Sequence, residues 1–344
     1  MTDHLLRMAE FVKGAELAGK TDPHLTMAAA SMDSLIDPLE KLWFLGCYAL
    51  TYNWPTAERI FLEWRPADFN QADFLMWSEE NWDGILLRKE RKAVFRKPFF
   101  AESAASYLTF ALGLSAVVSQ DPEVLAAKNY AQATELFTGN CRYMGRYIAA
   151  RWVEVMRRAF PEACGDWVMT EPGSSGAQHP RKALAMMYPE DAAALLGGDS
   201  KEEVRISDEV FDRFLLDMRM YGLELDYYTA HSLLCEYKQA SAGRKHYPGK
   251  SLDTEVAYLD KSYSYWGPEK ASESAFYPLR DVLFPHRSLG EKSGWKGARD
   301  GLLPLLADHG IVWSDQVYDY QQTTDLSHPV LRDPAITSLG DLLS

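Results

Sequence analysis

The sequence lacks the features of a secreted or membrane-spanning protein. Its four cysteines lie without pair spacing, which argues against a disulfide scaffold or a zinc ribbon and favours a reducing compartment. Its first residues contain no long apolar core and no cleavage site, so they do not form a secretory signal. Its most apolar stretch, Tyr107 to Val118, is too short and too interrupted to cross a bilayer. We therefore expect a cytoplasmic protein without a membrane partner.

Several sequence motifs for catalysis and metal binding are absent as well. No His-Glu-x-x-His sequence occurs, and the eight histidines are widely spread, so the residues predict no metal site. Neither a Gly-x-Ser-x-Gly elbow nor a dinucleotide-binding fingerprint is present. Alternating runs typical of strands do not stand out, whereas apolar residues recur at helical spacing. These patterns predict a mainly α protein.

Helical periodicity continues to about residue 265 and weakens beyond it, where glycine and proline become frequent. We expect residues 1–265 to form a helical domain that carries the candidate sites. Residues 266–344 are expected to form an irregular C-terminal extension that packs on it.

Individual helices can be placed from apolar spacing and from capping residues. Residues 99–119 predict a long buried helix, and 142–160 predict an amphipathic helix with Tyr143 on its inner face. Residues 207–240 predict an antiparallel helical hairpin that begins with a Ser207 cap. Residues 171–181 are typical of a loop.

The chain is acidic overall, with a formal net charge of −13, but its positive charge is concentrated. Residues 84–158 contain twelve Lys and Arg against six Asp and Glu. An acidic protein with one cationic segment repels polyanions everywhere except at that surface, which suits the binding of phosphate at one place. The candidate phosphate-binding residues are Arg88, Arg91, Lys92, Arg142, Arg146, Arg244, Lys245 and Lys250.

Two of these cationic groups also have an ordinary explanation. Phenylalanines interleave with the cations of residues 88–97, which would place aromatic faces beside a base, but the same run fits a solvated helix face. The loop 243–255 combines cations with glycines and would close over a phosphorylated ligand, or it is an exposed turn. It is not a Walker loop, because the first glycine of that motif is missing.

The third group lies where a helix is expected to begin. Arg142 and Arg146 are four residues apart, so both would project from one side of a helix, close to backbone N–H groups that attract anions. Helix-hairpin-helix elements that bind DNA are built in a related way, although their usual Gly-x-Gly signature is absent. The alternative is that the two arginines pair with Glu135 and Glu154.

The predicted hairpin supplies the candidate catalytic residues. Asp226 lies between its two helices, and Glu236 and Lys238 follow two to three turns later. A carboxylate near aromatic side chains is a candidate general base, or a ligand for a divalent ion beside phosphate. The alternatives are that Asp226 caps a helix and that Glu236 forms a buried ion pair.

Three segments together resemble a family of helical proteins that bacteriophages encode to hypermodify thymine in DNA, the putative amino acid:DNA transferases. The resemblance spans about residues 38–260 and rests on overall pattern. The segments are Trp43 to Tyr48 with Tyr52 to Ala57, Gly139 to Arg151, and Leu234 to Lys238 with Tyr247 to Gly249.

The resemblance implies a specific reaction. A partner kinase converts 5-hydroxymethyluracil in double-stranded DNA to a pyrophosphorylated form, and the transferase lets the amine of a free amino acid replace pyrophosphate. Arg and Lys, with Mg²⁺ as the implied cofactor, would neutralise the leaving group. The base would leave the stack. The resemblance further implies a fold related to helical DNA glycosylases, and the cytoplasm of the host cell as the location.

Two other functions remain open at this point. A helical enzyme similar to DNA glycosylases would release the base and would use an aspartate near the hairpin. A non-enzymatic phage protein would use its cationic stretch to bind DNA or an acidic partner. The acidity of the chain is unusual for a DNA-binding protein and argues against tight non-specific binding.

Overall fold

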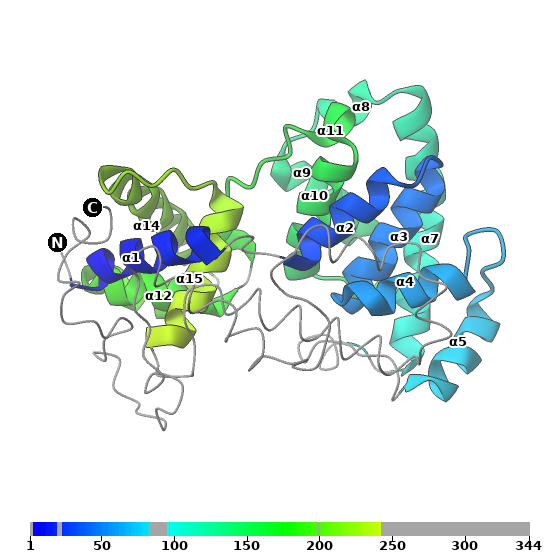
Figure 1. Cartoon of the computed structure of the whole chain (residues 1–344), viewed down its shortest axis with the longest axis horizontal. Coiled ribbons are helices and arrows are strands. Elements are labelled where there is room, and N and C mark those ends of the chain that lie inside the picture. The colour runs from blue at the N-terminus through cyan, green and yellow to red at the C-terminus, as the bar shows by residue number, and fades with distance from the viewer. Residues whose placement is uncertain are drawn as a thin grey trace. The chain divides into compact units, whose positions relative to one another are not determined.

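A computed structural model confirms that the chain is mainly helical. Every regular element within its described residues is a helix (Figure 1). The described residues are 3–18, 23–82, 95, 97–175, 177–197 and 200–241. They form two compact units: residues up to 23 and from 170 onward belong to the first, and residues 24–169 belong to the second. The expected boundary at residue 265 lies outside the described residues and stays a prediction.

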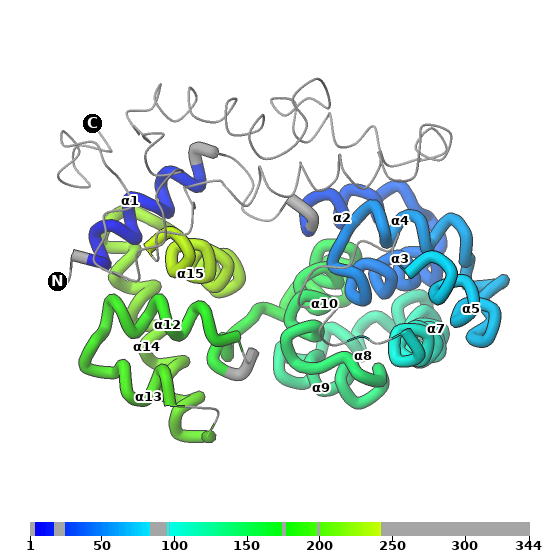
Figure 2. The backbone as a smooth tube through the Cα atoms, turned by 90° about the horizontal axis from the view of Figure 1, so that it is seen from below, coloured from blue at the N-terminus to red at the C-terminus, as the bar shows by residue number. Residues whose placement is uncertain are grey.

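The second unit is organised around one long helix, α7 (Lys97–Gln120), which packs against α3, α5, α8 and α9 (Figure 2). Helix α10 packs against α3, α9 and α11. The other helices of this unit are α2 (Pro23–Asp33), α3 (Pro38–Thr51), α4 (Trp54–Glu63), α5 (Gln71–Glu80), α8 (Glu123–Ala126), α9 (Tyr130–Asn140), α10 (Arg146–Ala159) and α11 (Pro161–Cys164).

Tyr107 of α7 lies at the centre of this unit and is fully buried. Its ring occupies the space beside Gly46 of α3, where a Cβ atom would come within 2.1 Å of a ring carbon. Its hydroxyl donates to the Leu42 carbonyl at 2.8 Å and accepts from the Trp152 indole N–H at 3.1 Å. One side chain therefore fixes α3, α7 and α10 to one another through buried and satisfied polar groups.

Capping residues define the sharp turn between α3 and α4. Asp37 caps α3 directly before Pro38, and its carboxylate accepts the Leu39 N–H at 2.9 Å. Tyr52 ends α3 in a left-handed conformation with φ of 47°, and Asn53 then caps α4 by accepting the Thr56 N–H at 3.0 Å. This turn lets α3 and α4 pack closely against each other.

Helix α7 confirms the predicted helix and extends it by a few residues, but it is only partly buried: its buried residues end at Leu114, and Leu112 is exposed. By length and composition alone, α7 could cross a membrane. It is the one helix among the described residues with these properties. Core helices of soluble proteins meet the same test, and α7 packs through Phe100, Ala104, Tyr107 and Ala111 within the second unit.

The first unit is assembled on α12, which packs against α1, α13, α14 and α15. Its apolar core contains Phe11, Phe211, Phe214 and Tyr237, and the Tyr237 hydroxyl donates to the carbonyl of His4 at 3.1 Å. Its elements are α1 (Asp3–Ala18), η2 (Pro172–Ser175), α12 (Gln178–Met187), η3 (Pro189–Asp191), α13 (Ala192–Gly197), α14 (Lys201–Met220) and α15 (Tyr227–Ser241).

Three local expectations from the sequence are wrong. Ser207 does not begin a helix: α14 starts six residues earlier at a capping box formed by Ser200 and Glu203, and Ser207 is buried inside it. The expected loop 171–181 becomes helical from Gln178 onward. The expected helix 142–160 begins only at Arg146, because Tyr143 adopts a left-handed φ of 58° that interrupts it.

Replacing Gly46 by alanine tests the contact with Tyr107. The added methyl group would overlap the ring, so we expect the free energy of unfolding to fall by about 2–3 kcal/mol in urea titrations followed by tryptophan fluorescence. Gly113→Ala on α7 is the matched control. Its Cβ would meet no atom within 4 Å, so helix propensity should stabilise it by up to about 1 kcal/mol. Equal effects of the two substitutions would contradict the packing described.

Candidate functional site

The turn between α9 and α10 is held in place by two serines of α7. The Arg142 backbone N–H donates to the Ser106 hydroxyl at 2.9 Å, and the Arg142 carbonyl accepts from the Ser103 hydroxyl at 2.9 Å. Ser103 is fully buried, so these bonds anchor the turn to the core of the second unit. The Arg142 side chain remains exposed.

Tyr143 is displayed at the surface of the same turn. Its ring stacks on Phe99 with the centroids 4.5 Å apart, yet 45% of the residue remains exposed. Its hydroxyl donates to the Glu102 carboxylate at 3.1 Å, and this bond raises the pKa of the tyrosine, which stays a neutral donor at physiological pH. An exposed aromatic ring that is held by a second ring suits stacking on a nucleobase.

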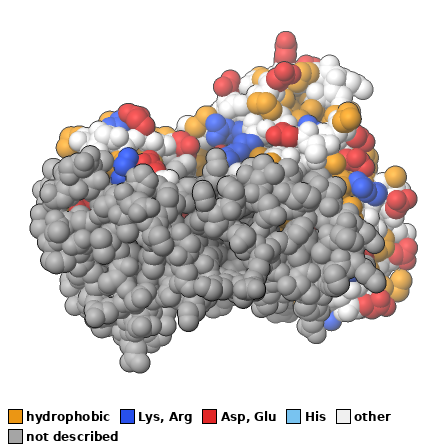
Figure 3. Space-filling view, in the orientation of Figure 1, with side chains coloured by type: hydrophobic (Ala, Val, Ile, Leu, Met, Phe, Trp, Pro, Cys, Tyr) orange, Lys and Arg blue, Asp and Glu red, His pale blue; other side chains and the backbone are white. Residues whose placement is uncertain are grey.

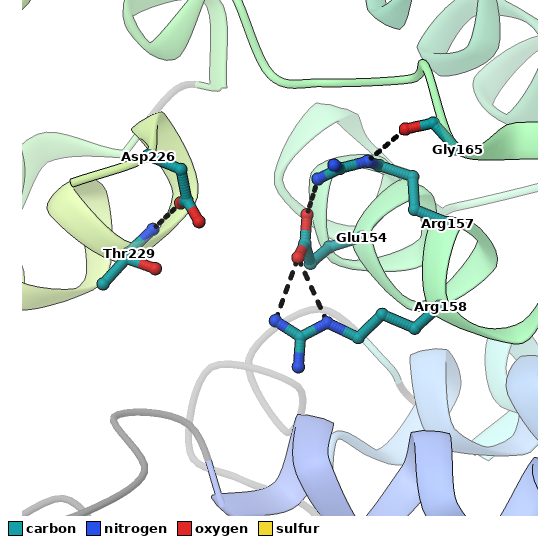
Figure 4. Close-up of polar contacts among 6 residues, drawn as sticks. All are labelled: Glu154, Arg157, Arg158, Gly165, Asp226 and Thr229. Atoms are coloured by element: carbon teal, nitrogen blue, oxygen red, sulfur yellow. Dashed lines mark hydrogen bonds and ion pairs between the residues drawn. The ribbon is translucent and has the colours of Figure 1, made fainter. Parts of the chain in front are cut away.

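Arg142 and Arg146 are both exposed, and their guanidinium groups have no ion-pair partner within the described residues. The predicted alternative, a pair with Glu154, does not form. Glu154 instead accepts from Arg157 at 3.0 Å and from Arg158 at 3.1 Å (Figure 4). Arg146 is the first residue of α10, which Gly145 precedes without any side-chain cap. The first N–H groups of this helix therefore add to the attraction for an anion.

A groove of about 730 Å³ extends from this turn along α7. Arg142, Glu102, Ser106 and Asn140 line it near the turn, and Lys128 lines it beyond α8. Its remaining walls combine the polar Gln71 and Thr109 with apolar positions, which are Ala105, Phe110, Gly113, Leu114, Val117, Val124, Leu125 and Leu136. The volume is in the range of ligand-binding sites.

The other predicted phosphate-binding residues lie outside the described residues. They are Arg88, Arg91, Lys92, Arg244, Lys245 and Lys250. Their role in binding phosphate stays a prediction.

The three predicted catalytic residues belong to the first unit and do not form one cluster. Asp226 caps α15, where its carboxylate accepts the Thr229 N–H at 2.6 Å (Figure 4). Glu236 is buried on α15, and Lys238 is half-buried two residues later. At 1.5 Å of rise per residue, Asp226 and Glu236 are about 15 Å apart along the helix. The capping role that the sequence offered for Asp226 is confirmed.

The sequence interpretation missed Asp208 of α14. This carboxylate accepts the Gly173 N–H at 2.6 Å, and partial burial, with Glu171 and Asp212 nearby, raises its pKa to about 6. Gly173 is required here, because a Cβ atom would come within 2.7 Å of that carboxylate and 2.8 Å of the Val204 carbonyl. The spacing of Asp208 and Asp212, four residues apart on one helix, is the signal in the sequence that indicates a perturbed carboxyl group.

No metal site is evident in the part of the chain that the structure describes, since no three His, Cys, Asp or Glu side chains are grouped closely enough to hold an ion. On the face drawn in Figure 3, basic and acidic side chains of the described residues are intermixed.

Comparisons with known proteins leave the identity of the chain open. It matches no protein-family model, no curated protein and no solved structure. The function must therefore be argued from the residues and their geometry.

Substitutions of Asp226 test whether its side chain stabilises the start of α15. Asp226→Ala removes the acceptor of the Thr229 N–H, so we expect the free energy of unfolding to fall by about 1 kcal/mol. Asp226→Asn keeps a good capping oxygen and should remain close to the original protein in thermal unfolding. If both variants are equally stable, the carboxylate does not stabilise the helix.

Asp208 predicts a pH dependence of stability. Folding raises the pKa of Asp208 from 3.8 to about 6, so the folded protein keeps a proton on this carboxyl group that the unfolded chain has released. The free energy of unfolding therefore falls as pH rises from 3.8 through about 6. Asp208→Asn should therefore raise stability at neutral pH by roughly 1 kcal/mol after allowance for solvent screening. It should also flatten the profile of thermal unfolding against pH. An unchanged slope in this window would show that Asp208 titrates normally.

Proposed function

We propose that this chain modifies thymine-derived bases in DNA, by transferring an amino acid onto pyrophosphorylated 5-hydroxymethyluracil. The observation that carries this proposal is the pair of exposed arginines without ion pairs, Arg142 and Arg146, which belong to the same short segment as the exposed ring of Tyr143. Cations beside an aromatic platform suit a ligand that has both phosphates and a base. The resemblance to the phage transferases supplies the reaction.

In the proposed reaction, the amine nitrogen of the amino acid attacks the methylene carbon on the base. The bond between that carbon and the pyrophosphate oxygen breaks, and pyrophosphate leaves with the electron pair. Arg142, Arg146 and the N-terminus of α10 neutralise the negative charge that develops on the leaving group. Donors of this kind lower the barrier most when they are held in place before the reaction. The serine bonds fix the backbone from which the Arg142 side chain extends.

The attacking amine must lose a proton. Glu102 is the carboxylate that lines the groove beside Arg142, and the Tyr143 hydroxyl orients it at 3.1 Å. We assign it the role of general base, which accepts a proton from the substrate ammonium group. Asp226, Glu236 and Lys238 of the first unit stay predicted contributors. The amino acid and the DNA base kinase are the partners that this reaction requires.

The decisive experiment supplies pyrophosphorylated 5-hydroxymethyluracil DNA together with a mixture of amino acids. Digestion and mass spectrometry should reveal a nucleoside that carries an amino acid. An abasic site would instead indicate an enzyme similar to DNA glycosylases, and unchanged DNA with every amino acid would contradict both enzymatic functions. Salt-dependent DNA binding without any reaction would favour the non-enzymatic alternative.

Arg142→Ala and Arg146→Ala should each lower the rate of transfer by about a hundredfold, because each removes a donor to the leaving group. Their stability should stay within about 0.5 kcal/mol of the original, since both side chains are exposed. Lys182→Ala removes an exposed cation of the first unit and serves as the matched control, with an unchanged rate expected. Full activity in both arginine variants would refute the phosphate assignment.

A further inference from the structure

The groove along α7 is longer than a single bound base or amino acid requires. Its lining on α7 runs from Glu102 to Val117, which corresponds to about 22 Å at 1.5 Å of rise per residue. A flipped base and its leaving group, bound at the turn, would not fill the part of the groove beyond Phe110. A ligand that fills the whole groove must therefore continue along α7.

The charges along the groove favour an anionic ligand. Arg142 lines one end and Lys128 lines the groove beyond α8, and neither side chain has an ion-pair partner in the described ranges. Glu102 is the acidic residue of the lining, and it already accepts the Tyr143 hydroxyl. Two cations at separate points suit a chain of phosphates better than one compact anion.

The walls between the cations favour exposed base faces. Val124 is exposed, and Phe110 and Leu136 are half-buried, so these three side chains present apolar surface to the groove. Gly113 leaves the α7 side of the groove open, with no atom within 4 Å of an added Cβ. In a duplex, stacking and pairing hide the faces of the bases. An unpaired strand presents phosphates and base faces together, which matches cations that alternate with apolar surface.

We propose that the α7 groove binds an unpaired stretch of the DNA strand that contains the target base. This inference rests on the proposed function for the identity of the ligand, and it extends that function from one flipped base to a run of unpaired nucleotides. The strand enters at Tyr143 and Arg142 and follows α7 toward Lys128. The protein would then favour DNA whose strands are already separated over DNA in a closed duplex.

Fluorescence anisotropy tests the inference with three probes of the same sequence: a labelled single-stranded oligodeoxynucleotide, its duplex and the corresponding RNA. No amino acid or pyrophosphate is needed. We expect the single strand to bind more tightly than the duplex and the RNA. Equal or tighter binding of the duplex would overturn the inference, and tighter binding of the RNA would overturn the assignment to DNA.

Variants of the groove should shift this binding in opposite directions. Lys128→Ala should weaken it about fivefold and should reduce the slope of log K against log salt by about 0.7, the value for one lost contact to a single strand. Glu102→Gln keeps the acceptor for Tyr143 but removes a negative charge, so affinity should rise. Lys182→Ala, on the first unit, should change neither. Loss of affinity in the Glu102 variant would contradict an anionic ligand.

A steric variant tests the path of the strand independently of charge. Gly113→Leu places a side chain in the open groove, whereas Gly139→Leu places one on α9 outside the lining, where an added Cβ also meets no atom within 4 Å. We expect only the Gly113 variant to lose single-strand binding, with both variants folded by circular dichroism. Transfer activity with unchanged binding in the Gly113 variant would refute this inference alone. Single-strand binding without any transfer would refute the proposed function alone.

Discussion

The second unit depends on the contact between Tyr107 and Gly46. Without a side chain at position 46, α3 leaves room for the tyrosine ring, and the hydroxyl can then reach both Leu42 and Trp152. Burial raises the pKa of Tyr107 well above its ordinary value, so the hydroxyl remains neutral and serves as donor and acceptor at once. Because α7 also holds the turn at Arg142 and lines the groove, this internal contact positions the candidate site.

The candidate site gains rigidity from elements that face the core on their other side. Ser103 is buried while its hydroxyl holds the Arg142 carbonyl, and the Trp167 indole donates to the Leu125 carbonyl at 2.9 Å, next to the groove. Groups fixed in this way lose little freedom when a ligand binds. The side chains of Arg142 and Lys128, in contrast, carry their charge outside these contacts and are free to adjust to a ligand.

The sequence predicts the helices far better than it predicts the site. Apolar spacing and caps such as Asp226 depend on near neighbours, so α7 and α15 lie close to where the pattern places them. The site depends on contacts that sequence spacing does not encode. Ser103 and Arg142, which are hydrogen-bonded, lie 39 residues apart in the sequence. Tyr143 has a left-handed backbone, but its position in the sequence fits the apolar spacing of a continuous helix. Gly145 was the local sign that the helix begins later.

The net charge of a sequence segment overestimates the positive charge available to a ligand, because some of its cations form ion pairs or are buried. Within residues 84–158, Arg157 and Arg158 share an ion pair with the single carboxylate of Glu154. Arg151 is buried with its guanidinium near the rings of Tyr52 and Tyr147. Among the described cations of that segment, those without an ion pair are Lys97, Lys128, Arg142 and Arg146. In an acidic protein, each such cation stands out against a repulsive background, so a few of them select where a polyanion binds. For the proposed ligand, affinity would depend on stacking and shape as much as on charge, which favours a strand with exposed bases over a uniform duplex.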